Sequence, residues 1–218
     1  MQSDQNELTS EQNLSDQEQT LTDQECVEYL EDLERFAIES ERFHDELARA
    51  IEEFFNVPVE LAPELLTEDM FASMLDWFIF DRKLARESRT PFEIYVAENE
   101  AEWPEERREI FRKFHNNVYS FFEIIKILDN KSVMIRDMLS LKEYELRAGY
   151  FIAHVDNGWC FVGRILPFKQ HHVLSGYVLA WGPDTTERVR DVFDYLRASG
   201  EPLEKLNPVE VHRMVSSL

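Results

Sequence analysis

The sequence has few of the residues that mark several common classes of protein. Two cysteines in 218 residues are too few for a disulfide scaffold, and they do not form the Cys-x-x-Cys pair usual in zinc sites. The six glycines compose neither a G-x-G-x-x-G motif nor a P-loop, which excludes nucleotide enzymes of those two classes. We interpret Cys26 and Cys160 as reduced thiols and expect no cofactor.

Long apolar runs are also missing. A membrane span needs ~20 mainly apolar residues, and the aromatic run at 77–80 is bounded by Asp76 and Asp81. The first residues are polar and acidic, unlike the basic and apolar parts of a secretion signal. The sequence therefore predicts a cytoplasmic location and no membrane partner.

Basic residues are scarce, since 23 Lys and Arg stand against 44 Asp and Glu and leave a net charge of −21. The imbalance lies in residues 1–118, which hold 31 acidic and 11 basic side chains, whereas residues 119–180 hold 6 and 7. We interpret the acidic part as a solvated helical surface that repels nucleic acid and anionic lipid, so nucleic acid is not an expected partner.

The first half of the chain has helical periodicity. Residues 1–21 are polar and acidic without an aromatic side chain, which predicts a disordered tail. In the helical region at 22–118, apolar residues recur at three- and four-residue steps to about residue 55, with a lapse near Ser40. A turn is expected from Val57 to Pro63 because two prolines disfavour a continuous helix. Further helix starts are predicted by caps or prolines at Thr67, Thr90-Pro91 and Trp103-Pro104.

The period then changes from helical to extended. Short β-branched and aromatic runs bounded by turn residues lie at 121–128, 133–137, 143–147, 159–166 and 172–179. They predict a small antiparallel β-barrel or strongly bent sheet over 119–181. Helices from about Thr185 and from the cap at Asn207 complete residues 182–218 and are expected to pack on the same core. The fold class is therefore α+β, with an N-terminal helical half, a barrel or sheet, and C-terminal helices.

A set of aromatic and turn residues makes the chain similar to a known group of proteins. In order, they are Asp76-Trp77-Phe78-Ile79-Phe80-Asp81, Arg89-Thr90-Pro91-Phe92-Glu93, Arg136-Asp137-Met138-Leu139 with Tyr144-Glu145-Leu146, and Gly163-Arg164-Ile165-Leu166-Pro167 with Leu174-Ser175-Gly176. Over roughly residues 65–180 the chain resembles a group of uncharacterised bacterial proteins, some of which end in the zinc-binding SEC-C motif of the SecA ATPase. The cysteine cluster of that motif is absent here, so the resemblance implies a fold and no activity.

Few residues of the sequence suggest a metal site or a catalytic site. Glu41 and His44 have the Glu-x-x-His spacing of di-iron bundles, but no second copy exists, so we expect no metal site. The spacing of Asp76 and Asp81 does not form an obvious acid–base pair, and we expect them to pair with neighbouring cations at 82, 83 or 86. No catalytic residue is assigned.

Three functions remain open. We favour a non-catalytic module that binds another protein through the helical half and the barrel face. The alternative is an enzyme with a dispersed site at the helix–barrel junction around Trp77, Asp81, Arg164 and His171. The third is an acidic mimic of nucleic acid.

A small basic patch on the barrel is a separate binding hypothesis. It would join Arg164 and Lys169 to either His171 or His172, which point to opposite faces of a strand, with Trp159 or Trp181 as a stacking surface. A solvated strand face is the simpler interpretation of the same residues.

Overall fold

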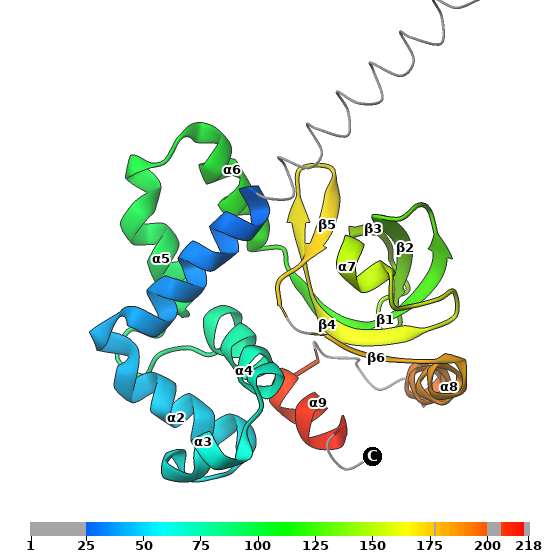
Figure 1. Ribbon diagram of the computed structural model, residues 1–218, viewed down its shortest axis with the longest axis horizontal. Helices are drawn as coiled ribbons and strands as arrows, with labels where there is room; N and C mark the ends of the chain where they lie inside the picture. Colours follow the sequence, from blue (N-terminus) through cyan, green and yellow to red (C-terminus); the bar gives the residue numbers. More distant parts are fainter. Residues whose placement is uncertain (1–24, 177, 200–205, 216–218) are drawn as a thin grey trace, which may run out of the picture.

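The structure, a computed structural model, describes residues 25–176, 178–199 and 206–215. It contains a helical half, a barrel and two C-terminal helices, which confirms the α+β class (Figure 1). The tail expected at 1–21 lies outside the described residues. Among the residues described, no helix is both long and apolar enough to cross a bilayer.

The helical half follows the caps and periodicities of the sequence. A helix over 25–39 ends at Ser40, where the apolar stripe lapses, and the 3-10 turn η1 begins the next helical segment. Thr90 forms the expected capping box, because its hydroxyl accepts from the Glu93 amide at 3.2 Å while the Glu93 carboxylate accepts from the Thr90 amide at 2.8 Å. The remaining elements are η1 (Glu41–Phe43), α2 (His44–Phe55), η2 (Val59–Leu61), α3 (Ala62–Leu65), α4 (Glu68–Phe80), α5 (Pro91–Asn99), η3 (Glu100–Glu102) and α6 (Glu105–Phe114).

The turn expected at 57–63 contains two short helical elements, η2 and α3. Pro63 lies in the first turn of α3, where a helix needs no amide hydrogen from it, so the proline limits the length of the helix without preventing it. Leu66 returns to an extended conformation, and Thr67 caps α4 through the Met70 amide at 3.3 Å.

Five strands close into a barrel in the order β1-β2-β3-β5-β4-β1, and β6 is added to the edge of β4. The strands are β1 (Val118–Ile127), β2 (Ser132–Asp137), β3 (Glu143–Arg147), β4 (Cys160–Phe168), β5 (His171–Leu174) and β6 (Leu179–Trp181). The barrel is not wholly antiparallel, because β3 and β5 run parallel. An odd number of strands in a ring cannot alternate in direction throughout, so at least one neighbouring pair must be parallel.

This strand order, with the one-turn helix α7 (Gly149–Ile152) between β3 and β4, is that of the OB-fold. The sequence did not reveal α7, because four residues make one turn and carry no detectable period. The strand expected at 172–179 divides into β5 and β6, with Ser175 and Gly176 between them.

Side chains pack into three apolar clusters. One fills the helical half and reaches the outside of β4 and β5, one fills the barrel, and one lies beneath α8 (Pro183–Ser199) and α9 (Pro208–Val215). The expected cap at Asn207 is present, since its side-chain oxygen accepts from the Val209 amide at 2.9 Å. Cys26 and Cys160 are buried in different clusters.

Removing the aromatic side chains of α4 should destabilise the whole protein. Phe78 is fully buried and packs edge-on to Phe43, and Trp77 is 5% exposed. Phe78→Ala and Trp77→Ala should each lower the free energy of unfolding by about 3–5 kcal/mol, because each leaves a cavity in addition to the lost burial. Val27→Ala, at a position 53% exposed, is the control and should change it by less than about 0.5 kcal/mol in urea denaturation. A nearly silent Trp77→Ala would contradict a core role for Trp77.

Candidate functional site

Strand β4 lies between two groups of helices. Its outward side chains alternate along the strand, with Cys160 and Val162 under the C-terminal helices and Leu166 and Phe168 against the helical half. Arg164 is the outward residue between these pairs. The alternation therefore places a cation where two apolar clusters meet.

Arg164 is held there by groups from three other segments. Its side chain is 0% exposed, and its Nε lies 2.9 Å from Asp76 Oδ2. Its two terminal nitrogens donate to Asp81 at the end of α4 and to Asn117 between α6 and β1. Ser175 donates its hydroxyl hydrogen to the other oxygen of Asp76. We call these five residues the junction cluster.

The partners of Asp76 and Asp81 differ from those expected from the sequence. We expected cations at 82, 83 or 86, but both aspartates bond to Arg164, and Arg82 bonds to Glu46 at 2.7 Å and Glu53 at 2.9 Å on α2. Asp76 and Asp81 lie 88 and 83 residues before Arg164 in the chain. Arg82, just after α4, therefore joins this region to α2, and Arg164 joins α4 and its end to the barrel.

The electrostatics of the cluster favour a permanently charged arginine. Burial disfavours the charged form of Arg164, but the two carboxylates outweigh burial and raise the pKa of Arg164 above its ordinary value. Burial also raises the pKa of the Tyr119 hydroxyl, and the charge of Asp76 adds to that effect. The Arg164 guanidinium lies 5.0 Å from the Phe80 ring centre and 5.5 Å from that of Tyr119, so aromatic faces cover the rest of the charge.

A third carboxylate, that of Glu34, interacts electrostatically with Asp76 of the cluster. Burial raises the pKa of Glu34, and the negative charges of Asp76 and Glu31 raise it further. Asp76 therefore acts on Glu34, which is half-buried in the helix over 25–39, as well as on Arg164.

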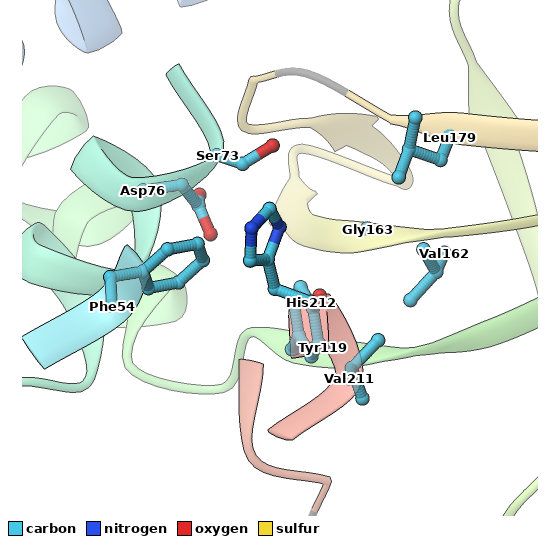
Figure 2. A pocket seen from close by; sticks show the side chains of 9 residues that line it. All are labelled: Phe54, Ser73, Asp76, Tyr119, Val162, Gly163, Leu179, Val211 and His212. Atoms are coloured by element: carbon cyan, nitrogen blue, oxygen red, sulfur yellow. The ribbon is translucent and has the colours of Figure 1, made fainter. Parts of the chain in front are cut away.

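A small pocket opens beside Asp76. Figure 2 shows His212 of α9 pointing toward Asp76 and Ser73 of α4, with Phe54 alongside. The His212 ring lies 4.8 Å from that of Phe54. The cavity volume is about 30 Å³, which is room for a water molecule or two and far below that of a drug-sized ligand site. The pocket can thus hold water against a carboxylate, an imidazole and the Tyr119 side chain.

The structure brings together only part of the expected enzyme site. Asp81 and Arg164 are in contact, whereas Trp77 packs in the helical core 5.4 Å from Phe54. His171 lies at the far end of β5, against Phe168 at 5.9 Å. Sequence reasoning did not identify Asn117, Tyr119 or Ser175 as site residues, because no motif or spacing relates them to Arg164.

The basic patch hypothesis is wrong for Arg164, because that residue is buried and neutralised rather than on the surface. Lys169 in the β4–β5 turn is exposed but pairs with Glu25 at 3.0 Å and Glu106 at 3.5 Å. These contacts hold the turn against the helical half.

The two histidines do point to opposite sides of β5, as predicted. His172 packs 4.8 Å from Tyr144 at the mouth of the barrel, where burial lowers the pKa of His172. Trp159, the proposed stacking surface, is half-buried beside the barrel cluster.

The face that binds ligands in many OB-folds has mixed charge here. That face lies on the outside of β2 and β3, where aromatic side chains often stack on bases. In this chain Arg136 pairs with Glu143 across the two strands at 2.8 Å, and Glu145 is exposed beside them. That nucleic acid is not a partner stays a prediction.

No metal site is assigned. Within the described ranges, no group of three or more histidine, cysteine or acidic side chains is disposed to hold a metal ion. Glu41 lies in η1 and His44 begins α2.

Comparisons with known proteins give a family and no activity. A family model described as "Family of unknown function (DUF7986)" matches residues 37–202, well over half of the 218 residues. No curated protein and no solved structure matches the chain.

Arg164→Met should lower the free energy of unfolding by about 3–5 kcal/mol, because it leaves Asp76 and Asp81 without their buried counter-charge. Adding Asp76→Asn and Asp81→Asn to it should restore part of the loss, because the triple variant buries no charge at these three positions. Urea denaturation measures both. Equal losses in the single and triple variants would show that packing of the arginine stem, and not its charge, stabilises the junction.

Glu34→Gln should stabilise the protein at neutral pH. The folded-state pKa of Glu34 is raised, so its favourable contribution is complete below the unfolded value of about 4.3 and is lost as pH rises through the folded value. The variant should therefore equal wild type near pH 4 and exceed it increasingly toward pH 7. Glu28→Gln, which removes an exposed charge from the same helix, is the control. A stability difference independent of pH would contradict the assignment.

Proposed function

The chain belongs to this family of unknown function, and from its surface we propose that it is a non-catalytic protein-binding module. The proposal rests on where large apolar side chains remain exposed. We propose the bacterial cytoplasm as its setting, which the resemblance to bacterial proteins supports.

Two exposed apolar pairs carry the proposal. Leu61 and Leu65, on η2 and α3, are 45% and 55% exposed, and Val192 and Tyr195, on α8, are 58% and 73% exposed. Residues three or four apart on a helix share one face, so each pair forms a contiguous patch. Grouped apolar side chains on a surface are typical of protein contact sites, whereas single ones are ordinary.

The junction cluster supports the same proposal. Its charged groups are directed at one another between the helical half and the barrel, so they hold the two parts together. A buried charge network of this kind is costly to open. A module whose halves are fixed in this way presents its surface patches in constant positions, which lowers the entropic cost of binding.

Capture with tagged full-length protein from its host lysate tests the proposal. Three baits are compared with wild type: Leu61→Ser with Leu65→Ser, Val192→Ser with Tyr195→Ser, and Leu128→Ser as a control for one exposed apolar residue outside both patches. We expect wild type and the Leu128 variant to retain a common protein at equal levels, and one double variant to lose at least nine-tenths of it. Equal recovery by all four baits would contradict a role for these surfaces. Thermal melting of each bait checks that it is folded.

A further inference from the structure

The end of the helical half formed by η2, α3 and the start of α4 combines exposed leucines with acidic side chains. We call this surface the leucine tip and define it by Leu61, Leu65, Glu60, Glu64, Glu68 and Asp69, all exposed. Figure 1 shows α3 at the lower edge of the helical half, away from the barrel.

The local fold explains why the leucines face outward. Ala62 is 6% exposed and, with the half-buried Leu66 four residues on, attaches this segment to the helical half. Leu61 and Leu65 each precede one of these anchors by one residue and lie on the outer side. Because Pro63 and the extended Leu66 limit α3 to four residues, the outer leucines are not covered by a further turn of the same helix.

The charge around the tip is of one sign. Residues 50–81 contain eight acidic side chains and no lysine or arginine. Asp76 and Asp81 are neutralised by Arg164, and Glu53 is neutralised by Arg82. The four acidic residues of the tip differ, because no ion pair within the described part of the chain involves any of them. The leucines thus have four exposed carboxylates as near neighbours in the sequence, none of them in an ion pair with a described residue.

This charge decides between possible occupants. Residues 1–24 of the chain carry six acidic and no basic side chains, so electrostatic repulsion disfavours their docking at the tip. A second copy of the chain, with net charge −21, is disfavoured for the same reason. A cationic partner is attracted by the carboxylates and can cover the leucines with its own apolar side chains.

We propose that the leucine tip binds a cationic amphipathic helix of another protein. The apolar residues of that helix, at spacings of three and four, contact Leu61 and Leu65, as in other complexes that seat a helix on an apolar surface. Its lysines or arginines pair with Glu60 and Glu64 beside them. Because these charges are exposed, they accelerate association and make binding weaken as salt rises. This inference rests on the proposed protein-binding function and names its surface and partner class.

Fluorescence anisotropy with a labelled synthetic peptide tests it on the full chain. The probe is an amphipathic 18-residue (~27 Å) helix with leucines on one face and lysines on the other. Its control is a scrambled peptide of the same composition with no apolar face. We expect the amphipathic peptide to bind at least tenfold tighter than the scrambled one. Leu61→Ser with Leu65→Ser should remove that preference, and Glu60→Gln with Glu64→Gln should weaken binding and reduce its salt dependence. Val192→Ser with Tyr195→Ser should leave binding unchanged.

Equal affinity for both peptides, or an unchanged preference in the leucine variant, would overturn the inference by showing that charge alone attracts the probe. An equal loss in the Val192 and Tyr195 variant would also overturn it. The capture experiment distinguishes failure of the leucine-tip proposal from failure of the protein-binding function. A partner lost only through the Val192 and Tyr195 surface would keep the protein-binding function and refute the tip, whereas equal capture by every bait would refute the function itself.

Discussion

The side chain of Arg164 brings a full positive charge to the boundary between two apolar clusters, and burying that charge constrains much of the surrounding structure. A buried guanidinium is tolerated only when its hydrogens are bonded and its charge is balanced. Asp76 and Asp81 supply the balance from α4, and Asn117 accepts from the terminal nitrogen that does not bond to Asp81. Asn117 is itself oriented by donating to the Phe114 carbonyl at the end of α6 at 2.9 Å. The position of α4 against the barrel is therefore fixed by charge as well as by packing.

The barrel makes this arrangement possible because β4 is buried on both faces. Inside, Phe161 and Ile165 belong to the barrel cluster, while the outward residues of the strand meet helices along its whole length. The outer face of the strand is covered by helices on either side of its midpoint, and the chain supplies them from the segments before and after the barrel. An OB-type barrel here serves as the central layer of a larger fold. Its strand order alone carries no function, since fold and function are separable.

The acidic residues fall into two groups, which differ in whether a cation pairs with them. Some neutralise cations that join elements, as Glu46 and Glu53 do with Arg82, and Glu25 does with Lys169. Others, at the leucine tip, neighbour exposed apolar side chains and form no ion pair with any residue that the structure describes. The first group contributes to the fold, and the second gives this surface a negative electrostatic field. Because paired charges cancel, the net charge of −21 comes from the acidic side chains that outnumber lysine and arginine.

Sequence alone determined the features that depend on near neighbours. The caps at Thr67, Thr90 and Asn207, the break at Ser40, and the change from helical to extended period after residue 117 are local, so a few adjacent residues specify them. The burial of Phe78 also follows from a helix that is apolar around most of its surface. The sequence did not predict helix α7, because a single helical turn is too short to show a periodic pattern of apolar residues.

Tertiary structure alone decided which charges meet. From the sequence, Asp76 and Asp81 have nearby cations at 82, 83 and 86, yet their partner is 83 or more residues away on β4. Spacing along a chain reports which residues share a helix face, but it cannot report which strand faces that helix after the barrel closes. The same limit applies to Arg164, which the sequence suggested as part of a basic surface patch and which the docked helices bury. The junction cluster exists because barrel closure and helix docking coincide at one residue.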